Sequence, residues 1–210
     1  MAWTSPRTWL AGEVLTAALL NTHLRDNLNA VRAGYATTLP ASPADGDIAV
    51  LVDSITNPTW QWKFRYNAGS ANADKWEYVG GAPAFATVDT QQNFTTGGSI
   101  HDLGTVGPSI TVPRAGVYLI RWGASMTPQT GGAFNSSCSA EIWNAASAQL
   151  GTKVAQINNQ GAEYAVSSED RISGIAASTE IRVRYKNTIS GGSGGYARFR
   201  YLEVLPIRVS

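Results

Sequence analysis

Hydrophobic and polar positions alternate over short stretches through most of this chain, and one stretch near the N-terminus departs from that pattern. Alternation with a period of two is typical of β-strands that bury one face. The exception is residues 17–32, an Ala- and Leu-rich run without Pro or Gly that ends before Gly34. The pattern therefore predicts a mainly β protein with one N-terminal helix.

This helix is predicted to begin after Thr16, whose hydroxyl can accept hydrogen bonds from the free backbone N–H groups of the first turn. Apolar residues then recur at spacings of four, four and three and form one stripe. They are Leu20, Leu24, Leu28 and Val31. A short helix is marginal in isolation, so the stripe needs a partner. Packing on its own domain is one alternative, and we favour packing against copies of itself or a larger assembly.

Residues 37–83 are predicted to form a small β unit. A turn cluster rich in Pro and containing an Asp-Gly pair covers residues 39–47, and strands are expected at 48–52, 60–66 and 75–79. The middle strand alternates strictly and places its aromatic residues on one face. They are Trp60, Trp62, Phe64 and Tyr66.

The aromatic face of strand 60–66 holds more apolar surface than so small a sheet covers alone. We therefore expect this face to meet another chain or the next domain. A row of aromatic residues also serves as a carbohydrate platform in some proteins, but a core or interface role is the interpretation we prefer.

Residues 84–210 are predicted to be almost entirely β. The candidate strands are short, similarly spaced and separated by turn residues, as in a sandwich of two antiparallel sheets. They cover residues 85–88, 109–112, 117–124, 139–143, 162–166, 169–175, 180–185 and 197–204. A Pro-Arg-Ala-Gly corner joins two of them. Pro113 presets one backbone angle there, and Gly116 tolerates conformations that other residues avoid.

Composition removes several classes of function. Charged residues make up 15% of the chain and the net charge is +1, without a basic stripe for nucleic acid or a polybasic segment for an anionic membrane. No apolar run approaches the length of a membrane span, and we expect no secretory signal at the N-terminus. The single cysteine, Cys138, excludes an intrachain disulfide and is expected to be a small apolar residue.

The residues that carry chemistry do not form a recognisable catalytic or metal-binding pattern. His23 and His101 have no carboxylates at metal-ligand spacing around them. Glu169 and Asp170 are adjacent, so on a strand they point to opposite faces and do not form an acid–base pair. No serine stands in a Gly-x-Ser-x-Gly turn. We expect no catalytic, cofactor or metal site, and an enzyme such as a wall hydrolase is the least supported alternative.

Residues 9–28 resemble the N-terminal segment of many structural proteins of tailed bacteriophages. Those segments pair a Trp-x-x-Gly-Glu opening with a Leu-Thr-Ala-Ala…Leu-Asn…Arg-Asp-Asn helix, and each element stands here in order. Residues 39–47, 64–70 and 75–81 are similar to a β module that follows the helix in such proteins.

The layout of residues 84–210 is similar to the trimeric jelly roll of the tumour necrosis factor-like proteins. Residues 112–118 match its Pro-x-x-Gly-x-Tyr corner, and residues 197–204 match its aromatic closing strand. The two resemblances together cover essentially the whole chain.

The resemblance implies a non-enzymatic virion protein, made in the host cytoplasm, that forms a homotrimer without a cofactor. Residues 1–36 would anchor it to capsid or tail proteins, residues 37–83 would connect, and residues 84–210 would form a jelly-roll head. The expected anchoring or trimer contacts are Trp3, Trp9 and the helix stripe. The short connector favours a short fibre, a spike, a decoration protein or a head fibre over a long tail fibre. The alternative is a tail adhesin that binds a host-surface glycan.

Overall fold

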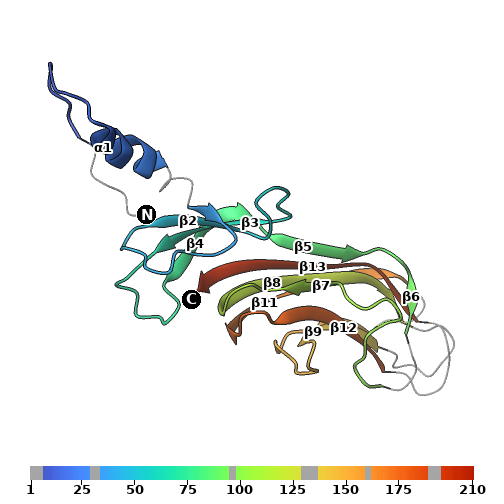
Figure 1. Ribbon diagram of the computed structural model, residues 1–210. Coiled ribbons are helices and arrows are strands. Elements are labelled where there is room, and N and C mark those ends of the chain that lie inside the picture. The colour runs from blue at the N-terminus through green and yellow to red at the C-terminus, as the bar shows by residue number, and fades with distance from the viewer. Residues whose placement is uncertain (1–6, 29–33, 95–97, 129–136, 159–161, 189–194) are drawn as a thin grey trace. The chain divides into compact units, whose positions relative to one another are not determined.

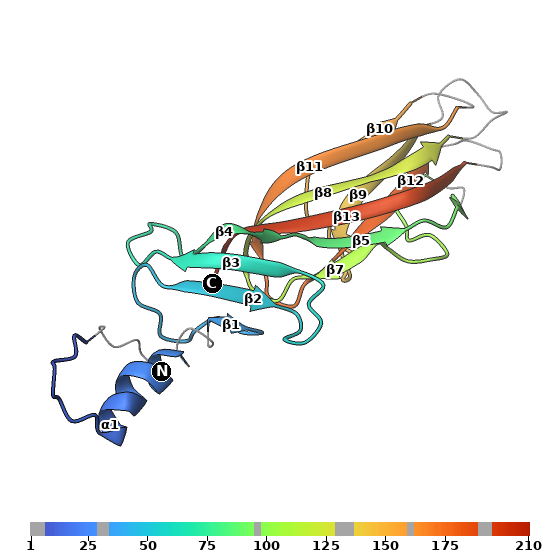
Figure 2. The same cartoon turned by 90° about the horizontal axis from the view of Figure 1, so that it is seen from above.

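The computed structural model describes residues 7–28, 34–94, 98–128, 137–158, 162–188 and 195–210 (Figures 1 and 2). It confirms a mainly β chain with a short N-terminal helix. The chain divides into two compact units, one of residues 1–69 with 78–82 and the other of residues 70–77 with 83–210. The division into three segments at residues 36 and 83 stays a prediction.

The N-terminal helix differs from the continuous α-helix expected over residues 17–32. Helix α1 (Ala17–Leu20) passes into the π-helical stretch η1 (Asn21–Arg25), in which the N–H of Asp26 donates to the Asn21 carbonyl. The Asn27 side-chain amide donates to the His23 carbonyl at 3.2 Å. The sequence pattern does not reveal this widened turn, because Leu and Ala are equally compatible with an unbroken α-helix. Residues 29–33 lie outside the described residues.

The predicted helix cap at Thr16 is confirmed. Its Oγ accepts a hydrogen bond from the Leu19 backbone N–H at 3.3 Å, with the extended backbone typical of a capping residue.

The β part of the first unit has the strand order β1-β2-β3-β4. The strands are β1 (Tyr35–Ala36), β2 (Ile48–Val52), β3 (Gln61–Tyr66) and β4 (Trp76–Ala82). Strand β2 runs parallel to β1 and antiparallel to β3. Gly81 in β4 has φ +122°, and a Cβ there would lie 2.0 Å from the Gln61 carbonyl oxygen. Only glycine permits this approach of the two backbones.

Trp62, Phe64 and Tyr66 of β3 share one face with Trp60, which directly precedes the strand, and of the expected core or interface roles Trp62 and Phe64 have the core role. Trp62 and Phe64 are completely buried within the single chain. The Trp60 ring stacks on Trp62 at 4.1 Å between centroids, and the Tyr78 ring meets Phe64 edge-on at 6.1 Å. The chain itself therefore covers these side chains. Trp60 and Tyr66 are half-buried, and their role at an interface stays a prediction.

The second unit is a jelly-roll-like sandwich of two antiparallel sheets, which confirms the predicted fold class. In one sheet β13 (Tyr196–Val209) pairs with β8 (Gly116–Thr127), and β8 pairs with β11 (Tyr164–Ile175). Strands β5 (Ala84–Val88) and β6 (Gln92–Asn93) also pair with β13, as do Trp76 and Glu77 of β4. The other sheet has the order β10-β9-β12-β7. Its strands are β10 (Ala155–Ile157), β9 (Ser137–Asn144), β12 (Glu180–Thr188) and β7 (Ser109–Thr111).

The strand boundaries depart from the sequence pattern in one instructive place. Residues 162–166 and 169–175, expected as two strands, belong to the single strand β11. Ser167 and Ser168 interrupt the hydrophobic pattern there, yet their backbones pair with β8 opposite Gly123 and Trp122. Pairing of the backbone outweighs side-chain polarity at an exposed face.

The core of the sandwich lies between the facing sides of the two sheets. Trp122 of β8 is fully buried, and its indole N–H donates to the Ala140 carbonyl of β9 at 2.9 Å, so it joins the sheets by a hydrogen bond as well as by packing. Cys138, two residues before Ala140 on β9, is also buried, as expected of a small apolar residue. Burial raises the pKa of the Cys138 thiol from 9.0 to about 12.

The Pro113–Gly116 corner is present, but the reason for its glycine differs from the one expected. Gly116 does not have a positive φ. A Cβ at this position would lie 2.2 Å from the Arg208 carbonyl oxygen of β13, so the glycine permits close approach of two strands. The Tyr118 hydroxyl donates to the Arg114 carbonyl at 2.6 Å and ties the corner to β8.

A bulge in β13 turns an arginine into the interior. Phe199 has φ +48°, and the pairing with β8 shifts register between Arg198 and Tyr201. Arg200 is consequently fully buried, and its Nη1 donates to the carbonyls of Thr105 and Gly107, each at 3.0 Å.

Candidate docking site in the N-terminal segment

Large apolar side chains are exposed along the described part of the N-terminal segment. They are Trp9, Leu10, Val14, Leu15, Leu20, Leu24 and Leu28. Leu24 is 53% exposed and Leu28 69%, although both belong to the predicted helix stripe. Trp3 and Val31, the other predicted anchoring residues, lie outside the described residues. Exposed apolar surface of this density is typical of an interaction site. We call residues 9–28 the docking segment.

A tight turn at residues 10–13 shapes the start of the docking segment. The Glu13 N–H donates to the Leu10 carbonyl at 3.1 Å, and the Leu10 N–H donates to the Glu13 carboxylate at 3.2 Å. Gly12 has φ +82°, a conformation that glycine adopts without strain. The Gly-Glu pair of the Trp-x-x-Gly-Glu motif therefore has a local structural reason: glycine makes the turn and glutamate closes it.

Trp9 contacts two polar side chains, Arg7 and His23. The Arg7 guanidinium forms an ion pair with the Glu13 carboxylate, and its Cζ lies 5.2 Å from the centroid of the Trp9 ring. The His23 ring meets Trp9 edge-on, with 6.0 Å between centroids and an interplanar angle of 85°. Residues of both the turn and the helix therefore contact the indole.

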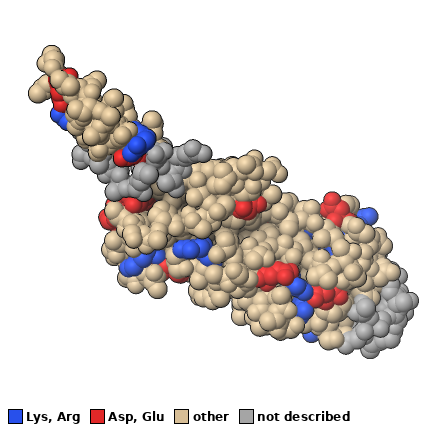
Figure 3. Space-filling view, viewed as in Figure 1, with Lys and Arg blue, Asp and Glu red and all other residues tan. Residues whose placement is uncertain are grey.

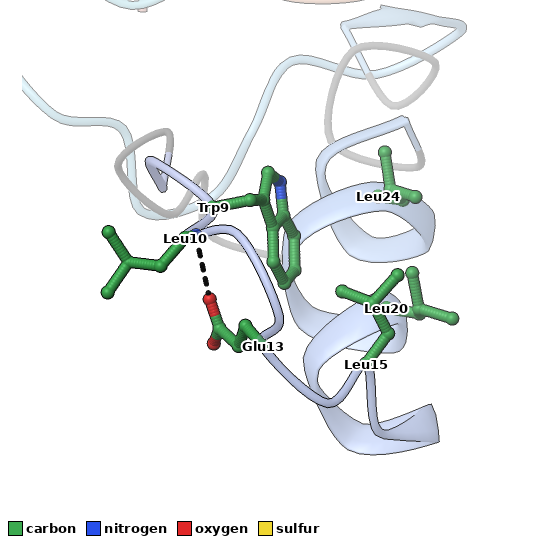
Figure 4. Close-up of a pocket in the computed structure, with 6 residues that line it drawn as sticks. All are labelled: Trp9, Leu10, Glu13, Leu15, Leu20 and Leu24. Atoms are coloured by element: carbon green, nitrogen blue, oxygen red, sulfur yellow. Dashed lines mark hydrogen bonds between the residues drawn. The ribbon is translucent and has the colours of Figure 1, made fainter.

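Between the turn and the helix lies a hollow of about 280 Å³ (Figure 4). Its lining is apolar apart from one carboxylate and consists of Trp9, Leu10, Glu13, Leu15, Leu20 and Leu24. Because Glu13 is already paired with Arg7 and the Leu10 N–H, the polar lining group is satisfied within the segment. The hollow therefore suits an apolar side chain of a partner.

The ionised side chains of residues 7–28 are paired with one another. Arg7 pairs with Glu13, and Arg25 pairs with Asp26 at 2.9 Å. On the face shown in Figure 3, charged side chains form small separate groups of both signs. The docking segment therefore offers a partner apolar area more than net charge.

The structure brings together three of the predicted contact residues and adds others. Trp9, Leu20 and Leu24 line one hollow, whereas Leu28 is exposed outside it. The sequence analysis missed Leu10 and Leu15. Leu15 directly precedes the cap residue Thr16, and Leu20 is the fourth helical residue after it, which is the spacing of a hydrophobic staple. This spacing was the signal available in the sequence.

The described residues form neither a metal-ion cluster nor a membrane-spanning helix. No group of three or more His, Cys, Asp or Glu side chains there is arranged to hold a metal ion. No helix in the same residues is long and apolar enough to cross a membrane.

Comparison with known proteins gave similarities to solved structures alone. No family model matches the chain, and no curated protein matches it. The infectious bursal disease virus VP2 subviral particle aligns at 15% identity and a TM-score of 0.43, over 80% of this chain and 41% of that one. The chain thus spans less than half the length of the capsid protein it matches.

Two smaller proteins also align with this chain. The Eiger TNF of S. frugiperda aligns at 11% identity and a TM-score of 0.36, over 60% of this chain and 95% of its own. The globular domain of zebrafish complement 1qA aligns at 14% identity and a TM-score of 0.33, over 60% and 98%. All these similarities are low, and none of them bears on function.

Proposed function

We propose that this protein is a non-enzymatic structural protein of a tailed-phage virion. It forms a homotrimeric short fibre, spike or decoration, anchored to the capsid or tail through the docking segment, with the jelly roll exposed. The observation that carries the proposal is the apolar, locally braced surface of residues 9–28.

The energetics of the docking segment support anchoring. Burying one leucine side chain contributes about 1.5–3 kcal/mol, and several leucines are exposed together here. The Gly12 turn and the Thr16 cap hold the segment in shape before it binds, which reduces the entropy lost on docking. A trimer would present three such segments to one particle, and simultaneous engagement raises the overall affinity without new contacts.

Reconstitution on particles made without the protein tests the anchoring role. Leu24→Gln should lower the occupancy at least tenfold, because it removes a leucine from the hollow. Val106→Gln is the matched control, since Val106 is 51% exposed in the other unit and should leave occupancy unchanged. Equal occupancy of both variants would contradict the proposal.

The homotrimer is tested by the mass of the full chain in solution. We expect three copies, each of 22.3 kDa, through closed symmetry. A stable monomer at micromolar concentration would contradict this part. Cryo-electron microscopy of the same reconstituted particles would then separate a head location from a tail location.

A further inference from the structure

The outer face of the sheet that contains β9 and β12 carries a cluster of polar groups around one tryptophan. This cluster belongs to the sandwich unit and is independent of the docking segment. We propose that it binds a neutral saccharide, with Trp143 under the sugar ring. This inference goes beyond the structural role proposed above and does not rest on it.

Strand alternation puts the cluster on the outer face. In β12, Val183 and Tyr185 are completely buried, whereas the alternating residues Arg182 and Arg184 keep 16% and 12% of their side chains exposed. The register pairs Arg182 with Trp143 and Arg184 with Glu141 of β9. The four side chains therefore lie on one side of two hydrogen-bonded strands, which run next to each other in Figure 1.

Trp143 is oriented by its neighbours on the sheet. Its indole N–H donates to Glu141 Oε2 at 3.3 Å, and the Gln149 side-chain amide donates to the same oxygen at 3.3 Å. The Arg184 Cζ lies 5.8 Å from the centroid of the Trp143 ring. A half-buried indole fixed in this way loses little freedom when a ligand stacks on it.

The guanidinium groups of the cluster are fixed by shared carboxylates. Asp102 Oδ2 accepts from Arg184 at 2.9 Å and from Arg182 at 3.3 Å, and Glu180 accepts from Arg182 at 2.9 Å. Asp102 Oδ1 and the Nε atoms of both arginines are buried without a hydrogen-bond partner. Because these atoms are buried, a ligand would meet the paired guanidinium and carboxylate groups instead, and these groups hold one another in place beside the Trp143 indole.

These properties select the class of ligand. Both arginines are paired with carboxylates, so an anionic ligand finds no unpaired guanidinium in the cluster, and Glu141 is held by the neutral Trp143 indole and Gln149 amide. Hydroxyl groups both donate and accept, and therefore suit a surface on which amide, carboxylate and guanidinium groups alternate. The apolar C–H face of a sugar ring suits an indole. A neutral, hydroxyl-rich polysaccharide meets both conditions.

Binding of the full-length protein to immobilised dextran, mannan and galactan tests the inference, with hyaluronate as the acidic counterpart. We expect binding to at least one neutral polysaccharide and at least tenfold weaker binding to hyaluronate. Trp143→Ala should weaken neutral binding at least tenfold. Phe85→Ala is the control, because Phe85 is an exposed aromatic residue on β5 of the other sheet and should change binding less than twofold.

If Trp143→Ala fails to fold, Glu141→Gln still tests the inference, because glutamine has nearly the same size as glutamate. This variant should weaken binding to the neutral polysaccharide severalfold. Thermal unfolding of each variant identifies a folding failure. Three results would overturn the inference: no binding of the unmodified protein to any neutral polysaccharide, preference for hyaluronate, or unchanged binding of the folded variants. Since free protein is used, a failure of virion anchoring does not affect the result.

Discussion

Single residues in this protein are constrained most strongly where two backbones approach each other. At Gly116 the restriction comes from the Arg208 carbonyl and not from the backbone angle. At Gly104, a Cβ would meet only the side-chain end of Gln92, which can rotate away. The two glycines therefore look alike in the sequence but differ in what they tolerate.

Gly116→Ala should lower the free energy of unfolding by about 1–3 kcal/mol, because a Cβ at 2.2 Å from a carbonyl oxygen forces β8 and β13 apart. Gly104→Ala is the control in the same unit and should change it by less than about 1 kcal/mol. Urea unfolding of both variants measures the difference. Equal stability of the two would show that the strands separate without cost.

Buried ionisable residues predict a loss of stability at alkaline pH. Burial raises the pKa of Cys138 to about 12, and burial also raises the pKa of Tyr118 and of Tyr185 above the ordinary value of 10.0. Above pH 9 the unfolded chain therefore loses protons that the folded chain keeps, so stability falls as pH rises. Thermal unfolding between pH 7 and 11 should show a decline from about pH 9.

Cys138→Ala removes the first of these groups, and the decline should then begin about one pH unit higher, where the tyrosines start to ionise. The pH of onset is the informative quantity, because the substitution also changes packing. A stability that stays constant up to pH 11 would contradict the burial of these groups.

Among the elements, strand β13 shows how a local irregularity places a charge in the core. The bulge at Phe199 reverses the alternation, so that Arg198 stays on the outside and Arg200 faces inward. Arg198 forms an ion pair with Glu163 near solvent. Arg200 donates hydrogen bonds to the carbonyls of Thr105 and Gly107 in the interior. Two arginines on one strand therefore have different structural roles.

Arg200→Met should reduce stability by about 1–3 kcal/mol, since it leaves two carbonyls without donors. Arg198→Met removes an exposed ion pair and should cost less than about 1 kcal/mol. Denaturant unfolding of both variants gives the comparison. A more stable Arg200→Met variant would show that desolvation of the guanidinium outweighs its hydrogen bonds.

For the molecule as a whole, the low charge of the chain and the internal ion pairs of the docking segment predict how anchoring responds to salt. The net charge of the chain is +1. Within the docking segment and the adjoining Arg7, Arg7 pairs with Glu13 and Arg25 pairs with Asp26. Attraction between opposite net charges would weaken as salt screens it, whereas burial of apolar area would not.

Particle occupancy by the full-length protein should therefore change less than twofold between 50 and 500 mM NaCl, and sulfate should increase it. Quantifying bound protein on reconstituted particles at each salt concentration provides the measurement. A loss of tenfold or more at high NaCl would indicate that charged contacts dominate anchoring.

Much of the fold follows from patterns in the sequence that depend on neighbouring residues. The Thr16 cap, the alternating strands β3 and β12, and the turn residues between strands each have a local cause and were predicted within a few residues. Strand β10 and the joined strand β11 were not predicted. Their pairing with β9 and β8 is made by backbone groups, which leave little trace in side-chain polarity.

The candidate docking site was predicted only in part, because the stripe was identified without the turn that faces it. Trp9, Leu20 and Leu24 were identified as an apolar stripe with an opening tryptophan, whereas the hollow also depends on the turn at Gly12 and on Leu15. The cluster around Trp143 was not predicted at all. It joins residues from β9, from β12 and from the segment that holds Asp102, and only the fold brings these together.

The sequence by itself determined the mainly β class, the helix start after Thr16 and the sandwich of short strands. Hydrophobic alternation, helix capping and turn formation each depend on residues that are close in the chain. Tertiary structure alone decided that Trp62 and Phe64 are core, that Arg200 faces inward, and that Gly116 is needed for close approach. These outcomes depend on which distant segments cover, pair with or approach a residue, and no local pattern encodes that.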